Sequence, residues 1–284
     1  MRRAFLFFLR NVRVVLLSLR SGAALHVDGP PGGVPLLFLH GLGGGAWSWK
    51  PQRAAFSGTH RVFVWEARGH GAAARVDDAS IADYYADARE ALAAVLDDAR
   101  RPAVVVGHSA GGFLAIRLAC ELAGGVRGLF LIEPGYELWS KTPLAFAAPV
   151  LGPLAGATVG ARLHTFFARA FENHERMEAV WQDQAAQVPF EYPQVFREAF
   201  AGVKGHPPRD FAKEIHDPTF LLVGSRVPLR LRRGIARLAS TLREHLGEDF
   251  QYESVRGGHY LQLDMPDVVN DRLQRFLNRL EEAR

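Results

Sequence analysis

The sequence predicts an α/β protein with a mostly parallel central sheet, helices on both faces and an inserted helical cap. Short apolar, β-branched runs alternate with longer stretches whose apolar residues recur at helical spacing. This alternation is typical of βαβ units, which surround a parallel sheet with helices. The alternation stops at residue 135 and resumes only after residue 210, which indicates an insertion.

That interruption predicts two units. Residues 1–134 and 211–284 are expected to form the sheet domain, and residues 135–210 are expected to form a helical cap, or lid. The chain has 284 residues and 48% hydrophobic content, enough for one large core that carries such an insertion. Prolines separate helix-like, aromatic-rich pieces of the cap, expected near 163–171, 176–187 and 194–200.

The elements of the sheet domain are placed by their apolar patterns. A strand–turn–strand unit is expected over residues 14–27, and the wholly apolar run 36–39 is typical of a strand buried on both faces. The further strands are expected at 61–65, 103–106, 129–132, 219–223 and 250–255. The helices are expected at 49–56, 81–98, 113–119, 233–245 and 267–280.

The basic residues are spread along the chain. Charged residues make up 23% of the sequence and the net charge is +4, but no basic run with interleaved aromatic residues occurs. This pattern favours a solvated surface over nucleic-acid binding, so the expected partner is a small-molecule substrate. The one cysteine, Cys120, cannot form an internal disulfide and is expected in the core. The pattern leaves the oligomeric state open.

The N-terminal segment is apolar in two short runs. Residues 4–9 and 14–19 are each too short to cross a membrane, and Arg10 and Arg13 interrupt them. The interruption also makes a poor secretory leader. We therefore expect a cytoplasmic protein, with peripheral membrane association through the N-terminal segment as the alternative.

A strand, a tight turn and a helix meet in residues 104–119, and the turn reads Gly107-His108-Ser109-Ala110-Gly111. The G-x-S-x-G pattern between a strand and a helix is typical of a nucleophile held at the apex of a strained, left-handed turn. The flanking glycines allow the strand and helix to pass closely. Ser109 is therefore the candidate nucleophile.

A serine hydroxyl needs a neighbouring base, and His259 is the best candidate. It follows the last expected strand in a Gly-Gly loop, at the same edge of the sheet as Ser109. An oxyanion needs preorganised N–H donors, for which the sequence offers Ala110 and, in the glycine-rich loop after residue 39, Leu42. His40, which opens that loop, is expected to brace it.

At this point the chain resembles the α/β-hydrolase superfamily, in its capped hydrolase branch. The matching motifs are His40-Gly41-Leu42-Gly43, Arg68-Gly69-His70-Gly71, the turn around Ser109, and Gly257-Gly258-His259-Tyr260. The resemblance implies a hydrolase fold and a Ser–His–acid triad, and says nothing specific about the substrate. Glu66 and Arg68, beside the second motif, are expected to be structural.

One departure from the family concerns the acid. Most relatives carry an aspartate three residues after a glycine that ends the next-to-last strand, but here Gly224 is followed by Val227 at that position. The alternative site in the superfamily, after the strand that follows the nucleophile helix, holds Glu133. We therefore assign the triad as Ser109, Glu133 and His259. The alternatives are a Ser–His dyad, or weak or absent activity.

The predicted function is hydrolysis of a carboxylic ester, or a related acyl bond, through an acyl-enzyme intermediate. The Phe- and Leu-rich cap, with Trp47 or Trp49 at the entrance, favours a small apolar substrate. No zinc-ligand cluster or phosphate-binding loop occurs, so no metal and no cofactor are expected. The alternatives are an acyltransferase, a carbon–carbon bond hydrolase or lyase, or an impaired ligand-binding or receptor protein.

Overall fold

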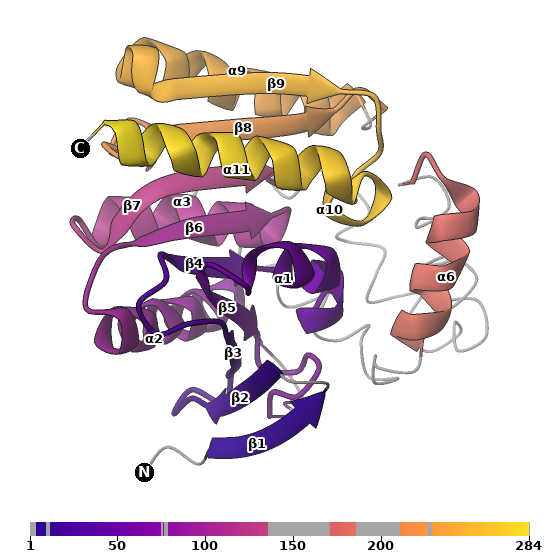
Figure 1. Ribbon diagram of the computed structural model, residues 1–284. Helices are drawn as coiled ribbons and strands as arrows, with labels where there is room; N and C mark the ends of the chain where they lie inside the picture. The colour runs from indigo at the N-terminus through magenta and orange to yellow at the C-terminus, as the bar shows by residue number, and fades with distance from the viewer. Residues whose placement is uncertain are drawn as a thin grey trace.

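A nine-stranded sheet forms the centre of the molecule, with the strand order β1-β2-β3-β5-β4-β6-β7-β8-β9 (Figure 1). The structure is a computed structural model that describes residues 4–9, 12–74, 76, 79–135, 171–185, 211–226 and 229–283. The strands from β5 across to β9 run parallel, and β1, β2 and β3 are antiparallel to their neighbours. The predicted fold class is confirmed.

The strands coincide closely with the apolar runs that predicted them. Their bounds are β1 (Ala4–Leu9), β2 (Val12–Ser18), β3 (Ala24–Asp28), β4 (Pro35–Leu39), β5 (Arg61–Glu66), β6 (Ala103–His108), β7 (Val126–Ile132), β8 (Thr219–Gly224) and β9 (Phe250–Val255). Every residue of β4, β6 and β8 is buried, as expected for strands covered on both faces.

The first strand is a finding that the apolar pattern did not predict. Strand β1 pairs antiparallel with β2, from Ala4 opposite Leu17 to Leu9 opposite Val12, and forms the edge of the sheet. A six-residue apolar run is too short for a membrane span but long enough for a strand. No helix in the described part of the chain is long and apolar enough to cross a membrane.

Helices cover both faces of the sheet (Figure 1). Helices α1 (Lys50–Phe56) and α11 (Pro266–Glu282) bury Phe56, Leu273 and Phe276 against one face. Helices α2 (Ile81–Ala99), α3 (Ala110–Glu121) and α9 (Leu229–Leu246) pack on the other. The described part of the chain therefore has one large apolar core on each side of the sheet.

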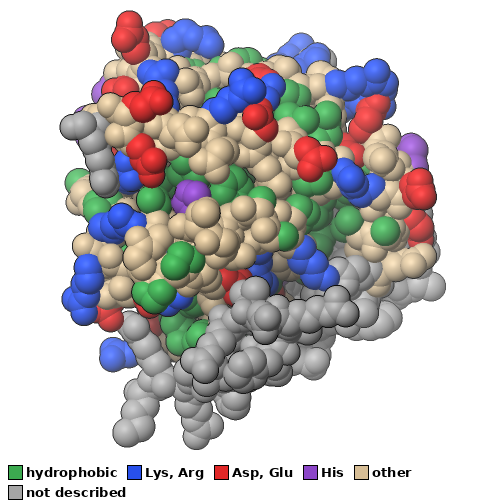
Figure 2. Space-filling view, in the orientation of Figure 1, with side chains coloured by type: hydrophobic (Ala, Val, Ile, Leu, Met, Phe, Trp, Pro, Cys, Tyr) green, Lys and Arg blue, Asp and Glu red, His purple; other side chains and the backbone are tan. Residues whose placement is uncertain are grey.

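Short elements surround the carboxyl ends of the parallel strands. They are η1 (Ala46–Trp49), α10 (Leu261–Asp264) and, from the predicted cap, α6 (His174–Ala185), whereas η3 (Gly247–Asp249) lies at the opposite edge, directly before β9. The helices expected near 163–171 and 194–200 lie outside the described residues, Phe171 excepted. The two-unit division therefore stays a prediction. On the described part of the face in Figure 2, basic and acidic side chains are interspersed.

Candidate active site

Ser109 occupies the turn between β6 and α3. Its backbone is left-handed, with φ 51° and ψ −119°, a conformation that is strained for a residue with a side chain. The Ser109 N–H donates to the carbonyl of Ile132 on β7 at 3.1 Å. On the other side, a Cβ on Gly111 would come within 2.1 Å of the Leu39 carbonyl oxygen on β4. Close packing on both neighbouring strands therefore fixes the turn.

His259 lies beside Ser109. It follows β9 in the loop before α10, and its Nε2 is 3.1 Å from the Ser109 Oγ. The His259 side chain is 12% exposed, so it is mostly buried but still reachable by solvent. A serine hydroxyl within hydrogen-bond distance of an imidazole is the arrangement needed for general-base activation.

Glu133 completes a line of three side chains. It is fully buried at the end of β7, and its φ of 46° is also left-handed. One carboxylate oxygen, Oε1, accepts the N–H of Gly224 at the end of β8. The other, Oε2, lies 3.8 Å from the Nδ1 of His259, within ion-pair range but longer than a direct hydrogen bond.

The surroundings of Glu133 act on its acidity in opposite directions. Burial raises the pKa of this carboxyl, while His259 and the Gly224 N–H favour the ionised form and lower it. Burial has the larger effect, so the pKa lies above its usual range. Of the loop where relatives carry the aspartate, Ser225 and Arg226 are exposed and Val227 lies outside the described residues.

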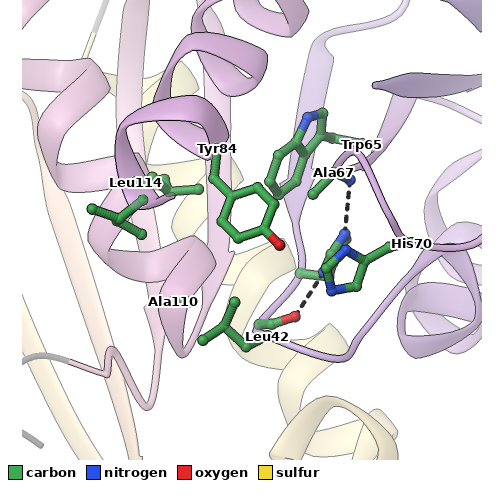
Figure 3. Close-up of a pocket in the computed structure, with 10 residues that line it drawn as sticks. Leu42, Trp65, Ala67, His70, Tyr84, Ala110 and Leu114 are labelled. Atoms are coloured by element: carbon green, nitrogen blue, oxygen red, sulfur yellow. Dashed lines mark hydrogen bonds between the residues drawn. The ribbon is translucent and has the colours of Figure 1, made fainter. Parts of the chain in front are cut away.

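The loop after β4 packs closely against Ser109. A Cβ on Gly41 would lie only 2.9 Å from the Ser109 Cβ, so a larger residue would push the loop away. Leu42 and Ala110 both line a small cavity of about 10 Å³ behind this loop (Figure 3). Tyr84 of α2 also points into it. The N–H of Ala110 is the first in α3, so it has no acceptor within the helix.

Two buried histidines brace this loop. The Nδ1 of His40 bonds the Gly41 carbonyl at 2.7 Å, and its Nε2 accepts the Ala67 N–H at 3.1 Å (Figure 3). His70 accepts the Gly43 N–H at 3.2 Å and bonds the Arg68 carbonyl.

Each ring therefore accepts a hydrogen bond through one nitrogen and donates one through the other, which requires the neutral form. Burial, with the neighbouring His70, lowers the pKa of His40 to about 3, and burial also lowers that of His70. The bracing role predicted for His40 is confirmed. Sequence reasoning missed the role of His70, although the Arg-Gly-His-Gly motif contains it.

Glu66 is held by structural contacts. Its carboxylate accepts hydrogen bonds from the His26 Nε2 at 2.8 Å, the Ala46 N–H at 2.7 Å and the Ala72 N–H at 2.8 Å. Burial alone would raise its pKa, but these donors hold the pKa down to about 2. Arg68 pairs with the buried Asp87 at 2.6 Å. The structural interpretation of Glu66 and Arg68 is confirmed.

The two tryptophans differ in their surroundings. Trp49 is fully buried against Phe38 on α1's face of the sheet, so its expected place at the entrance is wrong. Trp47 packs in an apolar cluster beside His259, which we call the mouth cluster: Trp47, Phe171, Met177, Tyr260 and Leu263. In the described residues, no group of three or more His, Cys, Asp or Glu side chains is arranged to hold a metal.

Comparisons with known proteins agree with this architecture. The model of the alpha/beta hydrolase family matches residues 36–272. A protein of Azorhizobium caulinodans, provisionally named as the carbamate hydrolase RutD, is 27% identical over 286 residues, 92% of this chain and 97% of that protein. A second protein of that provisional name, from Variovorax paradoxus, is 35% identical over 118 residues, and the match spans 42% of its length.

Solved structures share the fold at low sequence identity. The enol-lactonase from Burkholderia xenovorans LB400 has a TM-score of 0.72 at 20% identity, over 93% of this chain and 99% of its own. A thermophilic esterase from Thermogutta terrifontis has a TM-score of 0.73 at 19% identity, over 99% of both chains. Since the family model covers most of the sequence and its motifs, the chain belongs to the alpha/beta hydrolase family of enzymes.

Proposed function

We propose that the protein is a serine hydrolase that cleaves a carboxylic ester, or a closely related acyl bond such as a lactone. The observation that carries this proposal is the 3.1 Å contact between the His259 Nε2 and the Ser109 Oγ, at a strained strand-to-helix turn. Nucleophile and base are already within hydrogen-bond distance, and a strained turn is maintained only where the surroundings impose it.

The proposed reaction has two halves. His259 takes the proton of Ser109 as its Oγ attacks the substrate carbonyl, and the N–H groups of Leu42 and Ala110 stabilise the oxyanion that forms. His259 then gives its proton to the leaving alcohol, which leaves an ester between Ser109 and the acyl group. Water, deprotonated by His259, attacks this ester, and His259 returns that proton to the Ser109 Oγ as the bond to the acyl group breaks and the acid is released. Glu133 stabilises the imidazolium in both halves.

The proposed substrate is small and apolar. The mouth cluster supports this assignment, because it places Trp47, Phe171 and Met177 with Tyr260, the residue next to His259. An apolar acyl or alcohol group gains free energy by leaving water beside such side chains. The names of several relatives and fold neighbours, a carbamate hydrolase, an enol-lactonase and an esterase, indicate the range of acyl bonds to test.

Labelling with a fluorophosphonate probe tests the proposal. We expect the folded protein to be labelled and to hydrolyse p-nitrophenyl esters, and Ser109→Ala to lose labelling and at least roughly 1,000-fold in kcat/KM. Ser240→Ala, on the exposed face of α9, is the matched control and should behave as the wild type. A folded wild type that is neither labelled nor active on esters and lactones would contradict the proposal. Products that carry an added alcohol would instead identify an acyltransferase.

A further inference from the structure

His108, the residue before the nucleophile, contacts the loop that carries the base. It is the last residue of β6, its side chain is 1% exposed, and its Nε2 lies 2.8 Å from the backbone carbonyl oxygen of His259. A carbonyl oxygen can only accept a hydrogen bond, so Nε2 must carry the proton. The bond joins residues 151 positions apart, one of them next to the proposed nucleophile and the other the proposed base.

The His108 ring fills the space between the two loops of the site. Its centroid lies 4.8 Å from that of His259 and 5.0 Å from that of Tyr260. On the opposite side, a Cβ on Gly41 would come within 3.0 Å of the His108 Nδ1, so the ring also contacts the loop of Leu42. One imidazole therefore touches the base loop and the oxyanion loop and is covalently joined to Ser109.

The surroundings keep this imidazole neutral. Burial lowers its pKa well below the usual value, and the neighbouring His259 and His40 lower it further, while the bond to the His259 carbonyl raises it. A neutral ring adds no positive charge next to His259, which must itself gain a proton during the reaction. His108 therefore suits a geometric role rather than a proton-transfer role.

We propose that His108 is a positioning residue: its Nε2–H holds the His259 backbone at the distance that lets the His259 imidazole reach Ser109. The inference rests on the proposed function and adds a residue to it. Because His108 and Ser109 are adjacent in the chain, the length of this bond directly sets the separation of the base and the nucleophile. A small displacement of His259 would lower the rate, because proton transfer depends steeply on geometry.

The test compares His108→Leu, which removes the donor, with His108→Gln, whose side-chain N–H can reach the same carbonyl without titrating. We expect His108→Leu to lose roughly 10- to 100-fold in kcat with little change in KM, and His108→Gln to recover most of that loss. Thermal midpoints should be measured for both variants. A purely structural role of His108 would lower the two midpoints alike and would leave the kcat values of the two variants equal. Equal kcat values in folded Leu and Gln variants, or a Leu variant with wild-type kcat, would overturn the proposal.

A crystal structure of each variant provides a readout that needs no activity. We expect the separation of the Ser109 Oγ and the His259 Nε2 to lengthen in His108→Leu and to return to its original value in His108→Gln. An unchanged separation in the Leu variant would refute the positioning role even if no ester proves to be a substrate. Conversely, a wild type without labelling or activity would refute the proposed function while this structural arm still decides the role of His108.

Discussion

At the scale of single residues, the assignment of the acid is the sharpest question. Glu133 and Glu66 are both buried carboxylates at strand ends, yet their contacts differ. Glu66 accepts hydrogen bonds from structural donors only, whereas Oε2 of Glu133 faces the Nδ1 of His259 at 3.8 Å. Their glutamine variants therefore form a matched pair.

We expect Glu133→Gln to lower kcat by roughly 100- to 10,000-fold, because the imidazolium of His259 loses its counter-charge. Glu66→Gln should act chiefly on stability, because it removes the carboxylate that binds His26 and accepts the N–H groups of Ala46 and Ala72 in two loops. Steady-state kinetics and urea unfolding of both variants check this separation. An enzyme with unchanged kcat in Glu133→Gln would exclude Glu133 from the triad and favour a Ser–His dyad.

At the scale of elements, hydrogen bonds join α6 and the two residues before it to α10, the helix that follows His259. Asp264, the last residue of α10, accepts the N–H of Glu172 at 2.7 Å and that of Asn173 at 2.9 Å. Arg176 of α6 donates to the Asp264 backbone carbonyl at 2.9 Å. Asp264 is buried, so these bonds are shielded from water, and they join α6 to the segment that follows His259.

We expect Asp264→Ala to destabilise the protein, because two N–H groups would lose their acceptor at a cost of about 1–3 kcal/mol each where they stay buried. The free energy of unfolding in urea measures the cost, and limited proteolysis near residue 172 reports on the attachment of α6. Asp267→Ala, at an exposed position in the first turn of α11, is the control. Equal losses in the two variants would show that the attachment contributes little.

The sequence predicted the elements well where burial decides them. The central parallel strands β4, β6 and β8 were visible as apolar runs because both of their faces are covered. Strand β1 was missed because an edge strand of six apolar residues resembles a fragment of a leader or an anchor. The one-turn helix α10 was missed because its four residues have no period to detect.

The candidate site was predictable only in part, for a different reason. Ser109 and His259 were found through local patterns, a turn and a Gly-Gly loop. The contact of His108 with the His259 carbonyl joins residues 151 apart, and the G-x-S-x-G pattern accepts any residue at the position of His108. The left-handed backbone of Glu133 likewise has no local signal, since nothing in its neighbours favours it over an extended strand end.

At the scale of the whole molecule, the buried neutral histidines make folding sensitive to acid. The pKa of His40 is about 3 in the folded protein, and those of His70 and His108 are also lowered by burial. In the unfolded chain these groups titrate near pH 6.5. Below that pH the unfolded state binds more protons than the folded state. The free energy of unfolding therefore decreases as the pH is lowered, by roughly 1.4 kcal/mol per histidine per pH unit.

Two carboxyls, the buried Glu133 and the half-buried Asp217, oppose part of this loss. Burial raises the pKa of Asp217 to about 6 and also raises that of Glu133, so both bind protons in the folded state before the unfolded chain does. They recover stability as the pH falls below about 6, but the histidines outnumber them. We therefore expect the free energy of unfolding to fall between pH 7.5 and pH 5.5.

Urea unfolding at several pH values checks the sign, and His70→Gln isolates one group. Glutamine can accept the Gly43 N–H without titrating. We therefore expect the pH dependence of the free energy of unfolding to correspond to about one fewer proton bound on unfolding. The exposed His245→Gln is the control and should keep the wild-type slope. A wild-type slope in His70→Gln would mean that His70 is not protonated on unfolding.

The ends of β7 and β8, which flank the segment predicted as the cap, have a consequence for redesign of the protein. Glu133 directly follows β7, and the Gly224 N–H that it binds belongs to the last residue of β8. Pairing of β7 with β8, from Leu129 opposite Thr219 to Ile132 opposite Leu222, clamps both junctions whatever lies between them. This point is therefore a candidate graft site, at which we expect a foreign segment to replace the predicted cap without disturbing the contact between Glu133 and Gly224.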